Sequence, residues 1–146
     1  MKKVLSILVL ALVAVQFAFA GDVVTQDANQ LPLAARNFIN KYFSTPQISH
    51  IKIERNMLQS KNYEVLLTDR TEIDFDSNGN WTEVDCKKAA VPMALIPVMV
   101  RDYVQTNYPK DIITKIERRR NGVEVELSND YSLKFNNRGQ FVSLDD

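Results

Sequence analysis

The sequence has few of the residues that most often build catalytic and metal sites. Its 146 residues include one cysteine, Cys86, and one histidine, His50. A single cysteine excludes an intramolecular disulfide, so packing must hold the fold. Zinc needs three or four ligands, usually histidine and cysteine, and a Ser-His-Asp or Cys-His arrangement must use His50, which falls on the polar side of a predicted strand. We therefore expect no zinc site and no enzyme of the nucleophilic type.

The sequence also has no excess of charge of either sign. Lys and Arg total 18 and Asp and Glu total 18, so the formal net charge is zero. Proteins that bind nucleic acid usually concentrate Lys and Arg on one face. With 45% hydrophobic and 25% charged residues, the composition is that of an ordinary globular protein. We expect no nucleic-acid partner.

A long hydrophobic run occurs only at the N-terminus. Residues 1–20, MKKVLSILVLALVAVQFAFA, begin with two lysines, continue with an apolar run and end in Ala-Phe-Ala. This pattern is typical of a signal peptide, with cleavage expected before Gly21. Gln16 interrupts the run and Asp22 follows it closely, which disfavours a retained anchor. We expect a periplasmic or secreted protein with no membrane span after signal cleavage.

The rest of the chain predicts one structural unit that occurs twice, in residues 31–90 and 91–146. Residues 21–30 are polar, without apolar periodicity, and predict a flexible leader. In the first unit, apolar residues recur at helical spacing after Leu31-Pro32 and predict a helix that ends near Phe43. Apolar and polar residues then alternate as strands require. The expected strands of this unit are 48–54, 63–68, 72–76 and 81–86.

The two units match at two different offsets. Arg36 and Arg101, in the predicted helices, are 65 positions apart, whereas Gly79 and Gly139, in a later hairpin, are 60 positions apart. The difference lies in one hairpin loop, and the alternation is preserved on both sides of it. A gap confined to a loop indicates a structural repeat. We predict a tandem duplication of an α-β-β-β-β unit.

The predicted fold is of the α+β class. Each unit has too few elements to enclose a core alone, because small domains bury a poor fraction of their surface. We expect the units to share one antiparallel sheet of about eight strands, with both helices on one face. The other face is then open to solvent or to a partner.

The segments of the first unit closely resemble a known family. They are LPLAARNFINKYF, ISHIKIE, YEVLLTDRTEIDFDSNGNW and the link DCKKAAVPMALIP. They resemble the β-lactamase-inhibitor-like, PepSY-like exported proteins of Bacteroides-type bacteria, over essentially the whole chain after the signal peptide. The resemblance implies a duplicated α+β protein similar in fold to β-lactamase inhibitory protein, whose open sheet holds an enzyme. The sequence departs from that inhibitor in having no paired cysteines and no segment that matches an inhibitory loop.

One hairpin resembles the start of a calcium-binding loop. Asp74, Asp76 and Asn78 stand at alternate positions before Gly79, as the oxygen ligands of an EF-hand loop do. However, the flanking residues predict strands rather than helices, and the second unit repeats the glycine, as Gly139, without the carboxylates. We interpret the segment as a structural turn and keep calcium or small-ligand binding as the alternative.

Trp81 and Phe141 stand at matching positions of the two units. If Trp81 lies on the helix-covered face, it belongs to the core. If it lies on the open face, we expect Trp81, Leu66, Glu64 and Phe141 to form a partner-binding surface, because aromatic residues are enriched in binding hot spots. Trp81 and Val84 fall on opposite faces of an ideal strand, so the strand needs a bulge or one exposed apolar residue.

The acidic residues of the first unit leave one enzymatic alternative open. Paired carboxylates perform glycosidase chemistry, although acids on water-facing strands usually form only the polar face. Our leading hypothesis is an exported, non-enzymatic module without a cofactor, which binds an unknown exported protein or peptide through the open sheet face. The alternatives are a calcium or small-ligand site and a hydrolase with a carboxylate pair. The acids in question are Glu64, Glu72, Asp74, Asp76, Glu83 and Asp85.

Overall fold

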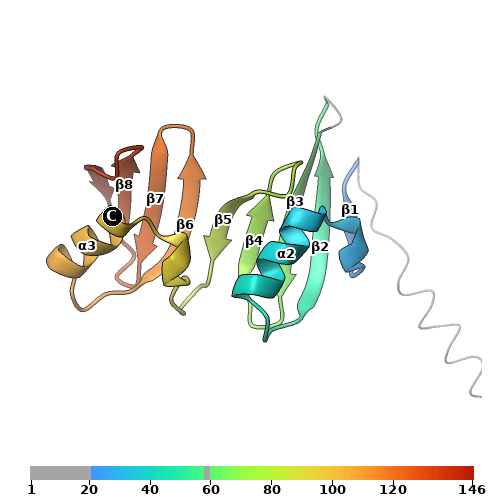
Figure 1. Ribbon diagram of the computed structural model, residues 1–146, viewed down its shortest axis with the longest axis horizontal. Helices are drawn as coiled ribbons and strands as arrows, with labels where there is room; N and C mark the ends of the chain where they lie inside the picture. The colour runs from blue at the N-terminus through green and yellow to red at the C-terminus, as the bar shows by residue number, and fades with distance from the viewer. Residues whose placement is uncertain (1–20, 58–59) are drawn as a thin grey trace, which may run out of the picture.

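The helices of the chain lie on one side of a single antiparallel sheet (Figure 1). A computed structural model describes residues 21–57 and 60–146, and the predicted signal peptide lies outside them. In the described chain, nine strands follow one another across the sheet in sequence order. They are β1 (Val23–Thr25), β2 (Ile48–Arg55), β3 (Lys61–Leu67), β4 (Glu72–Phe75), β5 (Trp81–Asp85), β6 (Ile113–Arg119), β7 (Gly122–Leu127), β8 (Ser132–Asn136) and β9 (Phe141–Asp145). The helices are α2 (Leu33–Tyr42) and α3 (Val98–Asn107), with 3-10 turns η1 (Ala28–Gln30) and η2 (Met93–Leu95).

The α+β class and the open antiparallel sheet are as the sequence predicts, and the order α-β-β-β-β occurs twice. α2 precedes β2 to β5, and α3 precedes β6 to β9. The halves join within the sheet because β5 pairs directly with β6. Common descent of the two halves from one duplicated unit remains a prediction from the sequence.

Residues 21–30 differ from the expected flexible leader. Val23 to Thr25 pair antiparallel with β2 as strand β1, which is why the sheet has nine strands rather than about eight. The side chain of Asp27 then accepts a hydrogen bond from the N–H of Asn29, at 3.0 Å, and caps η1. A three-residue edge strand is too short to show the apolar alternation by which strands are found in a sequence.

A row of aliphatic residues crosses the sheet under the helices and forms the centre of the core. Its members are direct cross-strand neighbours from β2 to β8, and each is 0% exposed. They are Ile51, Val65, Ile73, Val84, Ile116, Val125 and Leu133. Burying each such side chain contributes about 1.5–3 kcal/mol, so the row binds both halves into one core.

Each helix covers this row with the face that its apolar spacing predicts. α2 buries Ala35 and Ile39, and α3 buries Val100 and Val104. Pro32 and Pro97 precede the two helices as N-caps. Proline suits a helix start because its fixed φ is already helical and its missing donor would be unpaired there.

The bulge expected between Trp81 and Val84 is present. Both side chains are buried on the helix-covered face, at 8% and 0% exposure. The register of β4 and β5 shifts between Asp74 and Phe75, which lets two residues of opposite parity face the core. The pairing of β8 and β9 has a shift at the corresponding place.

Candidate functional site

Five carboxylates lie side by side across the middle of the open face of the sheet. Each is the direct cross-strand neighbour of the next, from β3 to β7, and we call this set the acidic row. Its members, in order, are Glu64, Asp74, Glu83, Glu117 and Glu124. The row ends at Lys52 of β2 on one side and at Lys134 of β8 on the other. Directly opposed side chains on one sheet face have Cβ atoms about 4.5–5.5 Å apart, and like charges at this spacing are destabilising.

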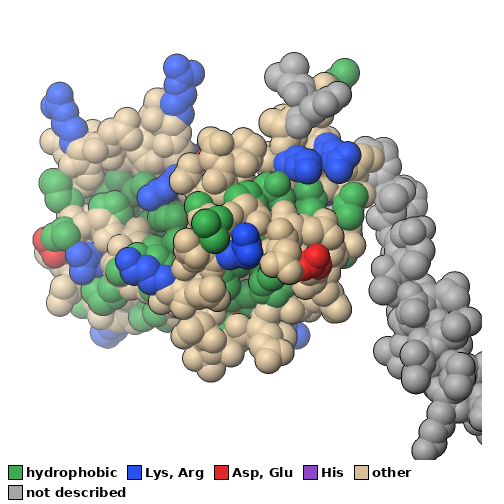
Figure 2. All heavy atoms as spheres, turned by 45° about the vertical axis from the view of Figure 1, so that its right-hand side comes forward, with side chains coloured by type: hydrophobic (Ala, Val, Ile, Leu, Met, Phe, Trp, Pro, Cys, Tyr) green, Lys and Arg blue, Asp and Glu red, His purple; other side chains and the backbone are tan. Residues whose placement is uncertain are grey.

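The side of the molecule that Figure 2 shows lies away from the acidic row. Figure 2 turns the view of Figure 1 by 45° and shows several Lys and Arg side chains but few acidic ones on the visible side. The open face is not uniformly acidic, because Lys52, Lys115 and Lys134 also lie on it.

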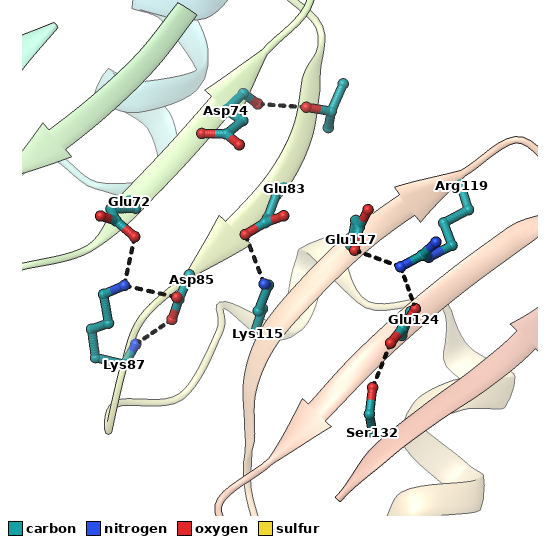
Figure 3. A network of polar contacts seen from close by, with 11 residues as sticks. Glu72, Asp74, Glu83, Asp85, Lys87, Lys115, Glu117, Arg119, Glu124 and Ser132 are labelled. Atoms are coloured by element: carbon teal, nitrogen blue, oxygen red, sulfur yellow. Dashed lines mark hydrogen bonds and ion pairs between the residues drawn. The ribbon is translucent and has the colours of Figure 1, made fainter. Parts of the chain in front are cut away.

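Neighbouring cations neutralise part of the acidic row (Figure 3). Lys115 lies 2.9 Å from Glu83. Arg119 lies 3.1 Å from Glu117 and 2.6 Å from Glu124. These side chains are partly exposed, and ion pairs at such positions contribute only about 0–1 kcal/mol each.

Glu64 and Asp74 form the end of the acidic row that has no described ion pair, although Lys52 lies opposite Glu64. In residues 21–57 and 60–146, no ion pair within 4.0 Å reaches either carboxylate. Burial raises the pKa of Asp74 from its ordinary value of 3.8 to about 7, and the charges of Glu83, Glu64, Glu72 and Glu54 add to the effect. Asp74 therefore exchanges its proton near neutral pH, and any cation that approaches this end favours its charged form.

A shallow hollow of about 170 Å³ lies at this end of the acidic row. Its lining is mainly polar and holds four carboxylates. The lining residues are Glu54, Asn62, Tyr63, Glu64, Asp74, Phe75, Asp76 and Thr82. The hollow is suited to a cationic group, because its walls supply negative charge and oxygen acceptors.

The four candidate binding residues do not share one face. Glu64 and Leu66 lie on the open face, where Leu66 is partly buried between His50 and Glu72. Trp81 lies under α2 on the other face, with its ring centroid 6.1 Å from that of Phe38.

Phe141 also lies on the helix side, stacked on Tyr103 of α3 with centroids 4.8 Å apart. The face of Trp81 was beyond sequence reasoning because the bulge in the β4–β5 pairing breaks the simple alternation. We therefore leave Trp81 and Phe141 out of the open-face surface.

The hairpin that resembles a calcium loop is organised as a turn. Asp76 Oδ1 accepts hydrogen bonds from the N–H groups of Asn78 and Asn80, each at 2.9 Å. In the second half, Asn136 Oδ1 accepts the corresponding bonds from Arg138 and Gln140, at 2.9 and 3.0 Å. A neutral amide thus builds the same turn, so the turn does not need the charge of Asp76.

Asp74 and Asp76 both line the hollow, but in the described structure they do not form part of a metal-binding group. No group of three or more His, Cys, Asp or Glu residues in the described ranges is placed to hold a metal ion. Asp74 points to the open face within the acidic row, whereas Asp76 is engaged in the turn. Calcium binding at this hairpin needs a rearrangement of these side chains.

The other candidate catalytic groups lie in unreactive settings. Burial raises the pKa of the Cys86 thiol to about 11, so the sulfur is protonated at neutral pH and is a poor nucleophile. His50 pairs with Leu66 on the open face, as the alternation in its strand predicts.

No helix among the described residues is long and apolar enough to cross a membrane.

The acidic row as a whole was not predicted from the sequence. Glu117 and Glu124 belong to the second half, and they join the acids of the first half only through the pairing of β5 with β6. Finding them would have required the register between β5 and β6, which places Glu83 opposite Glu117.

The chain is similar to known proteins in both sequence and fold. A family model described as "Putative beta-lactamase-inhibitor-like, PepSY-like" matches residues 61–143. A solved structure from Bacteroides vulgatus ATCC 8482, described as a "putative periplasmic protein of unknown function", is 44% identical with a TM-score of 0.83. The match covers 86% of this chain and 100% of that one.

Two further solved structures have the same fold. One, from Bacteroides thetaiotaomicron and described as a "putative calcium-regulated periplasmic protein", is 40% identical with a TM-score of 0.80, over 86% of this chain and 97% of that one. Another "putative periplasmic protein" from Bacteroides vulgatus is 36% identical with a TM-score of 0.80, over 88% of this chain and 100% of that one. No curated protein matches the chain.

Proposed function

This chain belongs to the β-lactamase-inhibitor-like, PepSY-like family, and we propose from this premise that it is an exported, non-enzymatic module that binds a protein or peptide through the open face of its sheet. The partner that suits this face is a basic segment, rich in Lys and Arg. The similarity to periplasmic proteins supports an exported location. Within that location, the predicted signal peptide is consistent with either the periplasm or secretion.

The observation that carries this proposal is the acidic row. Glu64 and Asp74 oppose like charges that no described ion pair bridges, at a cost of up to about 1 kcal/mol relative to neutral neighbours. Burial of Asp74 adds to that cost, because it raises the pKa of the carboxyl to about 7. A surface that is unfavourable in the free protein gains most when a cationic partner neutralises it, and such trade-offs are common where function competes with stability.

The test compares two variants with the same change in net charge. The first variant, Glu64→Gln/Asp74→Asn/Glu83→Gln, neutralises three members of the acidic row. The matched control, Asp102→Asn/Asp130→Asn/Asp146→Asn, neutralises three exposed acids that lie outside it. Immobilised wild-type, variant and control proteins are incubated with envelope extract, and the recovered proteins are quantified by mass spectrometry.

We expect the wild type and the control to recover the same basic partner and the variant to lose it. Recovery should fall as salt rises, because exposed charge interactions are screened over about 8–10 Å at physiological ionic strength. Equal recovery by all three proteins, or no partner for any of them, would contradict the proposal.

A second candidate function is calcium binding at the same end of the acidic row. It is supported by the hollow with its four carboxylates and by the likeness to a protein described as calcium-regulated. Ca²⁺ takes six to eight oxygen ligands at about 2.3–2.6 Å, so Glu54, Glu64 and Asp74 would have to turn toward the ion. Calorimetric titration with millimolar calcium tests this, with Asp74→Asn as the variant and Asp102→Asn as the control. An absence of heat with the wild type would remove the calcium function.

The hydrolase alternative uses the same carboxylates. A general acid with a pKa near neutrality is useful to a glycosidase, and Asp74 has one. The hollow is shallow and small, at about 170 Å³, which does not favour enclosing a substrate. Screening a panel of aryl glycosides with wild type and Asp74→Asn would reveal this activity, which our binding proposal predicts to be absent.

A further inference from the structure

The outer edge of β9 is a second exposed surface, and three of its five side chains are apolar. Phe141, Val142 and Leu144 are 40%, 61% and 39% exposed. In the part of the chain that the structure describes, β8 is the only strand that pairs with β9. Sheet edges carry unpaired N–H and C=O groups, and natural proteins usually protect them with charges, proline or a covering segment. An apolar edge can therefore be extended by a strand from a partner.

The pairing of β5 with β6 shows which contacts an added strand would make with the edge of β9. β5 is the fourth strand of the first half, as β9 is of the second half, and β6 covers its edge. Val84 of β5 lies opposite Ile116 of β6 and is 0% exposed. Leu144 stands 60 positions after Val84 and has no described neighbour on that side, which leaves it 39% exposed.

The aromatic residues of the two strands show the same difference. Arg118 of β6 lies over the ring of Trp81, with the guanidinium carbon 4.0 Å from the ring centroid, and donates a hydrogen bond to the Trp81 carbonyl at 3.4 Å. Trp81 is 8% exposed under this cover. Phe141 stacks on Tyr103 just as Trp81 stacks on Phe38, but among the described residues no cation lies over its ring.

The charges beside β9 favour a basic strand. On the open face, Asp85 of β5 lies opposite Lys115 of β6. Asp145 holds the corresponding place in β9, and its side chain is 59% exposed although it pairs with Lys134 at 2.6 Å. A lysine placed like Lys115 in an incoming strand would face Asp145.

A second copy of the chain does not offer a strand of this kind at its other edge. The strand equivalent to β6 is β2, and β1 already covers it, with Thr25 opposite Ile51. Pairing of a second copy in this way would require the loss of β1 from its own sheet. This favours a segment of a different protein as the occupant.

We propose that the outer edge of β9 binds an extended segment of a partner protein, added antiparallel as a further strand. The segment has the pattern Lys-aliphatic-x-Arg found at Lys115 to Arg118. Its aliphatic side chain covers Leu144, its arginine covers the ring of Phe141, and its lysine faces Asp145. This inference is independent of the proposed open-face function, because Phe141, Leu144 and Asp145 do not belong to the acidic row.

The test is a fluorescence anisotropy titration with a fluorescein-labelled peptide, DIITKIERR. The peptide has the sequence of β6 and of the two residues before it. We expect saturable binding to the wild-type protein. The variants Leu144→Lys and Val142→Lys place a charge on the edge, and we expect each to weaken binding by about tenfold or more. Val142 is the more exposed of the two, so its replacement preserves the fold if Leu144→Lys does not. The control Leu33→Lys changes an apolar residue of α2 that is 63% exposed and should bind as the wild type does.

Three results would overturn the proposal. The first is an absence of binding to the wild type at about 1 mM peptide, or equal affinity for wild type and both edge variants. The second is loss of binding in Glu64→Gln/Asp74→Asn/Glu83→Gln, which would assign the peptide to the acidic row instead. We expect the peptide affinity of that variant to stay within about twofold of the wild-type value. The third is self-association of the wild type in sedimentation experiments that Val142→Lys abolishes, which would make a second copy the occupant.

Discussion

Replacement of Asp74 by asparagine should stabilise the protein at neutral and alkaline pH. The pKa of this carboxyl rises from 3.8 to about 7 on folding, because the folded state buries it among other carboxylates. Below about pH 3.8 the group is protonated in both the folded and the unfolded state, so it costs nothing there. As the pH rises from 3.8 to 7, the unfolded state releases its proton first and the folded state loses stability, and above pH 7 the full cost is present.

The size of this effect follows from the shift of about three pH units. One unit corresponds to about 1.4 kcal/mol, which gives an upper value of about 4 kcal/mol. Asp74 is only partly buried, so solvent screening reduces the expected gain to roughly 2 kcal/mol. For a domain of this size, roughly 2 kcal/mol corresponds to an increase in Tm of about 4–8 °C.

Urea denaturation of wild type and Asp74→Asn at several values between pH 3.5 and about pH 8.5 measures this difference directly. The free energy of unfolding should be the same for both proteins at the acid end and should diverge as the pH approaches 7. Asp102→Asn, on the exposed side of α3, is the control and should follow the wild type at every pH. A difference that is independent of pH, or a variant less stable than the wild type at pH 8, would refute the reasoning.

Three further substitutions test the fold. Gly79→Ala should cost about 2 kcal/mol or more in urea denaturation, because φ is +83° and the new Cβ would lie 2.7 Å from Pro32 Cβ. Gly139→Ala should cost a similar amount, because φ is +76° and the new Cβ would lie 2.9 Å from Met99 Cβ. Trp81→Ala should lower the free energy of unfolding by about 3–5 kcal/mol, as for a core aromatic, and a loss under 1 kcal/mol would contradict its place under α2. Asp76→Asn should leave Tm within about 2 °C of the wild type, since Asn136 builds the same turn; a larger fall would mean that the turn needs the charge.

The helices and the longer strands were predictable because each has a residue pattern within its own segment of the sequence. Apolar residues at helical spacing after Pro32 and Pro97 indicate both helices, and alternation indicates the longer strands. Trp81 and Val84 indicated either a bulge or one exposed apolar residue in β5, because both are apolar and have opposite parity, and the structure shows the bulge. β1 was missed because three residues of an edge strand carry too short a pattern.

The candidate site was predictable only in part. Alternation within a strand assigned Glu64 to the polar face, but it gave no register between strands. The acidic row depends on that register, above all on the junction where Glu83 of β5 meets Glu117 of β6. The raised pKa of Asp74 was also beyond sequence reasoning, since it arises from burial and from carboxylates on neighbouring strands.

The most direct test of the open-face function is photo-crosslinking in the cell envelope. A photoreactive amino acid is placed at Glu117, the fourth member of the acidic row, or at Leu33, which is 63% exposed on α2. We predict crosslinks to a basic partner from position 117 and none from position 33. Crosslinks from position 33 alone, or none from position 117, would contradict the proposal that the open face binds the partner.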